Sequence, residues 1–179
     1  MRKKTALLIA NPHSRSGAQP LDAALDVLAK AGIVIERLDT KKAEDISPAI
    51  MGAAGNAKMV IVAGGDGTLN AAAKAAVETD LTLGILPMGT ANDLARTLDI
   101  PFTLEGAAQV IAGGKTRNID AGVVNGHHFF NVASIGLASD IAHSLTRETK
   151  RRLGRLSYPI TALRALASAA PFHAEIINK

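Results

Sequence analysis

Residues 59–70 read MVIVAGGDGTLN, and this stretch indicates the fold more strongly than any other in the chain. Its first four residues form a short apolar run, which is typical of a buried parallel strand, and helical periodicity begins at Leu69. The glycines between them have no Cβ, so backbone N–H groups can approach phosphate oxygens, and the start of the following helix adds partial positive charge. We therefore interpret GGDGT, residues 64–68, as a phosphate-binding loop; the alternative is a plain glycine turn with an aspartate cap.

Short apolar runs and segments of helical period alternate on both sides of this stretch. The predicted strands are residues 7–9, 33–35, 59–62 and 83–86, and the predicted helices are residues 21–28, 46–54, 69–77 and 104–111. Strand–helix alternation four times over predicts an α/β fold, a three-layer domain with a parallel sheet, over residues 1–114.

The pattern changes near Gly113-Gly114. Residues 116–124 and 127–132 flank the dipeptide Asn125-Gly126, which suits a type I′ turn and predicts a β-hairpin. Antiparallel pairing after a parallel sheet predicts a second, β-rich domain over residues 115–179. The predicted elements that follow are helices at residues 137–147 and 150–169 and a strand at residues 172–177. We expect the remainder of this second domain to be absent from the chain.

Two further loops follow predicted strands. PMGTANDLA, residues 87–95, places a glycine and a hydroxyl after the fourth strand and ahead of a short helix. Asn11-Pro12 opens the loop after the first strand, and Ser16-Gly17 lies near its end; alone, this loop favours an ordinary connection. Adjacent loops at the carboxyl ends of parallel strands line one crevice in an open α/β sheet. We therefore expect the three loops to form one site.

The composition of the 179 residues excludes several classes of site. The chain has no cysteine, which removes disulfides, cysteine-bound zinc, iron–sulfur clusters and thiol nucleophiles. Aromatic residues make up 3%, which supplies a stacking platform poorly, so we expect no nucleic-acid partner. The net charge of +4 suits an anionic substrate or a membrane surface. No apolar run approaches the ~18 residues of a membrane span, so we expect a cytoplasmic protein.

Other phosphate-binding and nucleophile motifs fail at single positions. Gln109 stands where a P-loop ending in Gly114-Lys115-Thr116 needs its leading glycine, and Asn70 stands where the dinucleotide fingerprint needs its third glycine. Val132 stands where a nucleophile elbow around Ser134 needs a glycine.

Residues 64–70 and 87–95 together resemble the diacylglycerol kinase catalytic domain family, which includes bacterial lipid kinases, ceramide kinases and sphingosine kinases. Asn11-Pro12 resembles the family's first-strand loop, and residues 131–136 resemble the segment where its second domain starts. The resemblance covers essentially the whole chain and implies an NAD kinase-like or phosphofructokinase-like nucleotide-binding fold. The glycine–aspartate loop alone is shared with those two classes, whereas the pair of loops is specific.

The resemblance implies ATP-dependent phosphorylation of a lipid hydroxyl, with ATP and Mg²⁺ as cofactors and diacylglycerol or a related lipid as acceptor. Asp66 would be the catalytic residue beside the γ-phosphate or its metal, because a carboxylate repels phosphates unless it acts through Mg²⁺ or a proton. Phosphoryl transfer depends mostly on positioning and charge neutralisation, which such a loop supplies. The implied nucleotide-binding residues are Asn11, Thr40, Gly64, Gly65, Asp66, Gly67, Thr68, Leu69, Asn70, Gly89 and Thr90.

Members of the family run to roughly twice this length in domain terms. Their later half supplies the acidic Mg²⁺ residues and the aspartate that acts as base on the lipid hydroxyl, so we assign no metal ligands here. We expect a nucleotide-binding domain followed by a truncated second domain. Two alternatives stay open: an NAD kinase-like small-molecule kinase, although the chain has no Asn-Glu dipeptide after the glycine loop, and a non-catalytic nucleotide-binding module.

Two surfaces bear on partners. Arg147, Arg151 and Arg155 share one face at helical spacing and indicate either a solvated helix face or contact with anionic lipid headgroups at the inner membrane face. Val123 and Val124 belong to the hairpin of the truncated domain and would lack packing partners there. Such patches drive association, so we expect a homodimer or a poorly soluble protein.

Overall fold

The computed structural model describes residues 4–10 and 21–132. The Asn11-Pro12 loop, the basic residues between 147 and 164, and the elements expected beyond residue 136 lie outside the described residues. The described part forms a four-stranded sheet, flanking helices and a two-stranded hairpin.

The sheet is parallel throughout, and its strands lie in the order β2-β1-β3-β4. The strands are β1 (Lys4–Ala10), β2 (Ile33–Leu38), β3 (Met59–Gly64) and β4 (Thr82–Pro87). Each contains the apolar run from which it was predicted; β1 and β3 are covered on both faces and need apolar side chains along their length, whereas the edge strand β2 has exposed charged residues near its end. The predicted parallel sheet is confirmed.

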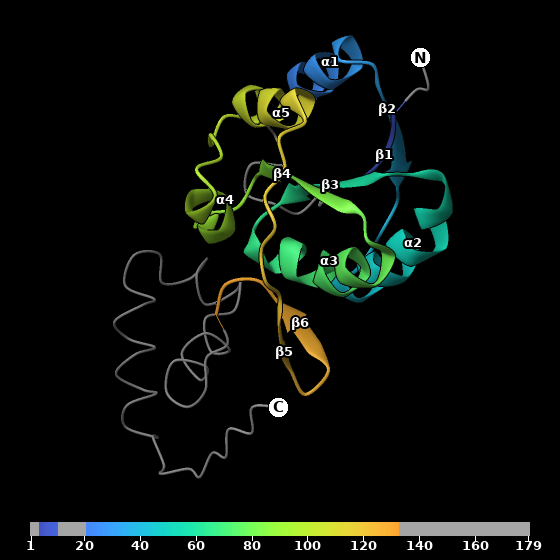
Figure 1. Ribbon diagram of the computed structural model, residues 1–179, viewed down its shortest axis with the longest axis vertical. Coiled ribbons are helices and arrows are strands. Elements are labelled where there is room, and N and C mark those ends of the chain that lie inside the picture. The colour runs from blue at the N-terminus through green and yellow to red at the C-terminus, as the bar shows by residue number, and fades with distance from the viewer. Residues whose placement is uncertain (1–3, 11–20, 133–179) are drawn as a thin grey trace, which may run out of the picture. The chain divides into compact units, whose positions relative to one another are not determined.

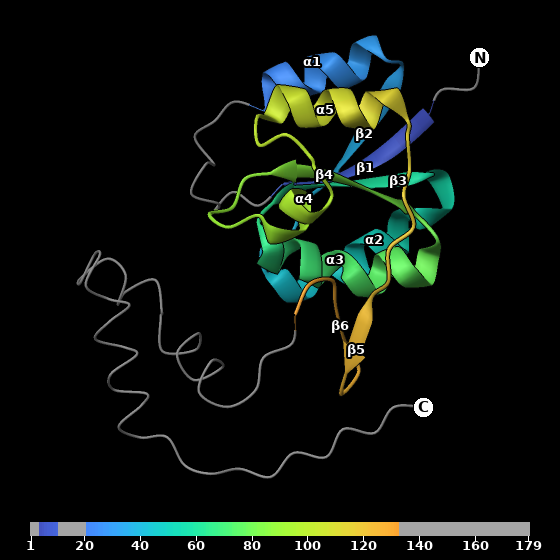
Figure 2. The ribbon, with the colours of Figure 1, turned by 60° about the vertical axis from the view of Figure 1, so that its left-hand side comes forward.

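Helices cover both faces of the sheet, as Figures 1 and 2 show. On one face α1 (Asp22–Lys30) packs against α5 (Leu104–Gly113), and on the other α2 (Ile46–Ala53) packs against α3 (Asp66–Thr79). The shorter helices are η1 (Ala43–Asp45), η2 (Ala54–Asn56) and α4 (Asp93–Thr97). The three-layer α/β architecture is confirmed.

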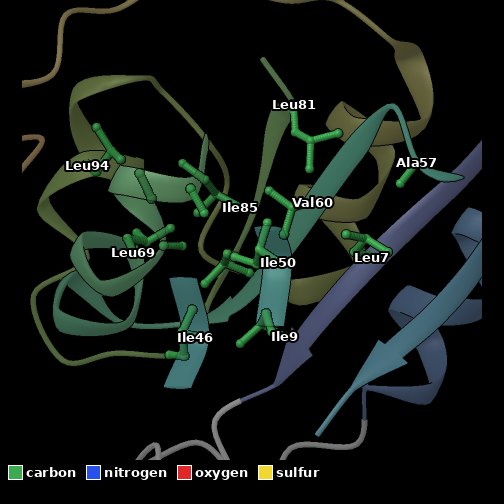
Figure 3. Packing of buried hydrophobic residues seen from close by; sticks show 14 residues of the cluster. Leu7, Ile9, Ile46, Ile50, Ala57, Val60, Leu69, Leu81, Ile85 and Leu94 are labelled. Atoms are coloured by element: carbon green, nitrogen blue, oxygen red, sulfur yellow. The ribbon is translucent and has the colours of Figure 1, made fainter. Parts of the chain in front are cut away.

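The sheet separates two apolar cores, since successive side chains of a strand point to opposite faces. In β1, Leu7 and Ile9 enter the core under α2 and α3, whereas Ala6 and Leu8 enter the core under α1 and α5. Figure 3 shows the first core, where side chains from both helices and from the sheet converge. The alternation of one strand therefore stabilises both helix layers at once.

The hairpin consists of β5 (Gly122–Val124) and β6 (His127–Phe129), joined by Asn125 and Gly126. Both turn residues have positive φ, 50° and 78°, as a type I′ turn requires, so the predicted turn is confirmed. The strands are much shorter than predicted, because residues 116–121 and Phe130 have no strand partner within the described part of the chain. Strand β6 lies against α3 (Figure 1).

The chain divides into two compact units, residues 1–131 and 132–179, so the hairpin belongs to the same unit as the sheet. The domain boundary expected after residue 114 rests on the change from parallel to antiparallel pairing and stays a prediction. Within the part that the structure describes, no helix combines the length and the apolar character that crossing a bilayer requires.

Candidate functional site

The candidate site lies at the edge of the sheet where the parallel strands end. Gly64 pairs with Pro87 at the ends of β3 and β4, and the N–H of Met88 donates to the carbonyl of Gly64 at 2.9 Å. The loops after these strands therefore start side by side. Strand β3 also borders the point where the strand order reverses, between β1 and β3, and ligands of open α/β sheets bind at such points.

The GGDGT loop is shorter than predicted, because α3 already begins at Asp66. Gly65 is the residue that precedes the helix, and its carbonyl accepts the N–H groups of Thr68 and Leu69. The first N–H groups of a helix have no acceptor within the helix, so this end of α3 presents donors to an anion. Gly67 lies in the first turn, is exposed, and has no heavy atom within 4 Å of the place where a Cβ would stand.

The two glycine loops touch through their backbones. A Cβ on Gly65 would stand 2.8 Å from the Cα of Gly89, and a Cβ on Gly89 would stand 2.5 Å from the Cα of Gly65. Side chains essentially never approach backbone atoms this closely, so both positions require glycine. The contact makes the β3–α3 and β4–α4 loops one structural unit.

Asp66 connects these loops a second time. Its Oδ1 accepts a hydrogen bond from the N–H of Leu94 at 3.2 Å, which caps the second residue of α4 from a segment 28 residues away. The side chain of Asp66 is half-buried, and its Oδ2 accepts no hydrogen bond among the described residues. One carboxylate oxygen is therefore used in joining the loops, and the other has no hydrogen-bond partner among the described residues.

Asn92 directly precedes α4, but its side chain does not cap the helix. Its side chain turns back to Gly89, where Oδ1 accepts from the backbone N–H at 2.8 Å and Nδ2 donates to the backbone carbonyl at 3.0 Å. Sequence reasoning quoted this residue within the loop but gave it no role. An asparagine directly before a helix is a cap signal, and nothing local shows that its side chain is used elsewhere.

The other sequence-predicted residues spread over the same edge and beyond it. Thr90 is exposed within the β4–α4 loop, and Thr40 is half-buried two residues after β2, with β1 between β2 and β3. The side chain of Leu69 is only 2% exposed and packs in the core, so its own contribution is the backbone hydrogen bond to Gly65. Asn70 accepts the N–H of Phe130 through Oδ1 at 3.2 Å.

Two of the predicted site residues remain, Thr68 and Asn11. Thr68 is buried, and its side chain lies beside Gly64, where an added Cβ would stand 2.6 Å from it. Asn11 lies outside the described residues.

The polar groups at this edge of the sheet suit an anion, such as a phosphate, that has a metal cation bound to it. Among residues 4–10 and 21–132 no group of three or more His, Cys, Asp or Glu side chains could hold a metal ion. Mg²⁺ in phosphate sites is commonly held by one or two carboxylates together with substrate phosphates. The second oxygen of Asp66 beside the start of α3 fits that arrangement, and the open space in front of Gly67 fits a phosphate.

Comparison with known proteins identifies the family of the chain. The family model described as "Diacylglycerol kinase catalytic domain" matches residues 5–124. The chain is 38% identical over 121 residues to a diacylglycerol kinase of Bacillus subtilis, covering 66% of the chain and 40% of that protein. It is 34% identical over 169 residues to a diacylglycerol kinase of Staphylococcus aureus, covering 92% of the chain and 54% of that protein.

The fold is also similar to a solved structure. A crystal structure of a diacylglycerol kinase from Bacillus anthracis matches with a TM-score of 0.68 and 30% identity, covering 90% of the chain and 54% of that structure. The chain therefore spans about half the length of the relatives that it matches.

Proposed function

This chain belongs to the diacylglycerol kinase catalytic domain family, and on that premise we propose that it forms the nucleotide-binding part of an ATP-dependent lipid kinase. The reaction is transfer of the γ-phosphoryl group of ATP to a lipid hydroxyl. The chain would supply the nucleotide side of this transfer, and we expect the base for the lipid hydroxyl in the part of the relatives' length that the chain does not span.

The observation that carries the proposal is the union of the two glycine loops in front of α3. Backbone contact between Gly65 and Gly89 holds both loops at the edge of the sheet, and among the described residues no heavy atom outside the first turn of α3 lies within 4 Å of the place where a Cβ of Gly67 would stand. A helix start with open space before it, framed by two glycine-containing loops, is suited to phosphate oxygens.

Each described residue of the site has one part in this proposal. The N–H groups of Asp66 and Gly67, the first two residues of α3, would bind phosphate, and Oδ2 of Asp66 would help to hold the cation that accompanies ATP. The hydroxyl of Thr90 would bind the nucleotide from the end of the neighbouring strand β4, and that of Thr40 from the end of β2, on the other side of β1. Bound Mg²⁺ supplies neutralisation of the charge that develops during phosphoryl transfer. Asp66 is held for this task by its bond to Leu94.

Replacement of Gly67 by alanine tests the proposed site. The Cα–Cβ bonds of a helix tilt toward its N-terminus, so the new methyl group would point into the space in front of α3. We expect Gly67→Ala to weaken binding of ATP–Mg²⁺ at least about tenfold, from an unaltered affinity between about 1 μM and 1 mM. Alanine also favours helix over glycine by up to about 1 kcal/mol, so the free energy of unfolding should not fall.

Gly52→Ala is the matched control. Gly52 lies in α2, is exposed, and likewise has no heavy atom near the position of an added Cβ. The two substitutions should affect unfolding by urea alike, whereas calorimetry with ATP–Mg²⁺ should separate them. Equal affinities for both variants would show that phosphate does not bind at the start of α3.

The acceptor is the second part of the proposal. The names of the relatives support diacylglycerol, and an assay with labelled ATP and vesicles that contain diacylglycerol would detect phosphatidic acid. We expect the chain alone to be at least ~100-fold slower than a full-length relative, because a positioned base contributes at least that factor. Phosphorylation of NAD in place of lipid would favour the NAD kinase-like alternative, and ATP binding without any transfer would favour a non-catalytic module.

Peripheral membrane contact and a homodimer stay predictions. A lipid acceptor requires contact with a bilayer surface, and the basic residues expected to make it lie outside the described residues. Val123 and Val124 are 55% and 45% exposed, which supports association through the hairpin. Light scattering and flotation with anionic vesicles would test these two predictions.

A further inference from the structure

Asn92 has a backbone conformation that few residues adopt. Its φ of 50° and ψ of 48° lie in the left-handed region, which asparagine tolerates better than most other residues with a side chain. The residue is 9% exposed although its side chain is polar. A buried amide in this conformation needs hydrogen bonds, and Asn92 finds both of them on one residue.

The two hydrogen bonds of Asn92 fix the peptides on both sides of Gly89. The N–H of Gly89 belongs to the peptide after Met88, and its carbonyl belongs to the peptide that leads into Thr90. A Cβ on Gly89 would stand 2.7 Å from Oδ1 of Asn92 and 2.5 Å from the Cα of Gly65. The amide of Asn92, Gly89 and Gly65 therefore meet at one point.

The same residue joins this point to α4. The carbonyl of Asn92 accepts the N–H of Arg96 at 3.0 Å, which forms the first turn of the helix. Both polar groups of its side chain bond within the loop, and the residue is 9% exposed, so little of the amide is accessible to a ligand. Thr90, by contrast, is exposed.

We propose that Asn92 is a positioning residue for nucleotide binding, which acts through Gly89 to hold Thr90 in the orientation that binds phosphate. This inference rests on the proposed function, because it assigns a source of affinity to the same site. It assigns Asn92 no contact with the nucleotide. The loss of Asn92 should therefore remove the contribution of Thr90 without adding a separate loss of its own.

A double-mutant cycle tests this mechanism. Asn92→Gly keeps the left-handed conformation and removes both hydrogen bonds, and Thr90→Ala removes the hydroxyl. We expect Thr90→Ala to weaken binding of ATP–Mg²⁺ up to about tenfold, which corresponds to one ordinary hydrogen bond, and Asn92→Gly to weaken it by about as much and no more. The double variant should bind no more weakly than Thr90→Ala, because the two residues act in series.

Asn125→Gly is the control, since Asn125 has the same φ of 50° but lies exposed in the hairpin turn. It should leave the affinity unchanged. Affinity losses of Asn92→Gly and Thr90→Ala that multiply in the double variant would show independent or merely structural roles and overturn the proposal, as would an unchanged affinity of Asn92→Gly. If Asn92→Gly does not fold, Asn92→Asp replaces it in the cycle, since aspartate keeps the acceptor and loses the donor.

Three further outcomes would also decide whether Asn92 has the positioning role. If neither variant at position 92 folds, Asn92 serves the whole fold and the positioning role is overturned. If the unaltered chain does not bind ATP–Mg²⁺, the proposed function fails and this inference fails with it. Binding by the unaltered chain with a normal affinity for Asn92→Gly leaves the proposed function intact and overturns the inference alone.

Discussion

The joined glycine loops and the β5–β6 hairpin each contain an asparagine with a φ of 50°. Asn92 is buried, and its side chain is bonded to Gly89, whereas Asn125 is exposed in a two-residue turn. Local sequence signals identify the hairpin turn, because its geometry depends only on neighbouring residues. They do not identify the task of Asn92, which depends on how two distant loops meet. Asn125 therefore belongs to a turn that only reverses the chain, whereas Asn92 belongs to a turn that also joins two loops.

The largest effect should come from filling the contact between the loops. We expect Gly65→Ala to lower the free energy of unfolding by about 1–3 kcal/mol, as overpacking does, because its Cβ would stand 2.8 Å from the backbone of Gly89. Binding of ATP–Mg²⁺ should be lost together with stability. Urea unfolding followed by circular dichroism measures the first, and calorimetry measures the second. Wild-type stability of Gly65→Ala would contradict a rigid contact between the loops.

The sheet could be predicted from sequence because burial on both faces demands apolar runs, and these runs stand out at residues 7–9 and 83–86. The meeting of the loops at one edge followed from parallel topology alone. The bonds within that edge did not, since Asp66–Leu94 and Asn92–Gly89 depend on side-chain directions and on backbone approach between segments far apart in sequence. The start of α3 was placed three residues late, because Asp66, Gly67 and Thr68 have no apolar periodicity.

Two substitutions of Asp66 should separate its structural oxygen from its charge. Asp66→Ala leaves the N–H of Leu94 without its acceptor, and we expect a loss of about 1–3 kcal/mol in the free energy of unfolding. Asp66→Asn keeps an acceptor for that N–H, so its stability should stay within about 0.5 kcal/mol of the unaltered chain. Both variants lose the carboxylate that faces the cation. We therefore expect both to lose the dependence of ATP affinity on Mg²⁺, measured by titration at fixed ATP.

The outcome for Asp66→Asn decides between the two tasks of this residue. A stable variant whose ATP affinity still rises with Mg²⁺ would limit Asp66 to its cap on α4. An unstable Asp66→Asn would show that the charge itself, and not an acceptor oxygen, holds the loops together.

The smallest effect should come from the bond that ties the hairpin segment to α3. Oδ1 of Asn70 accepts the N–H of Phe130, one helical turn beyond Asp66 and 60 residues away in sequence. We expect Asn70→Ala to cost about 1 kcal/mol, because a half-buried N–H loses its partner. The loosening should be confined to the hairpin, so hydrogen exchange should accelerate at Phe130 and remain slow in β3. Asn70→Asp keeps an acceptor and serves as the control, with exchange at Phe130 as slow as in the unaltered chain. Faster exchange across the whole sheet in Asn70→Ala would contradict the separation of the two regions, because the hairpin would then support the fold and not merely lie against it.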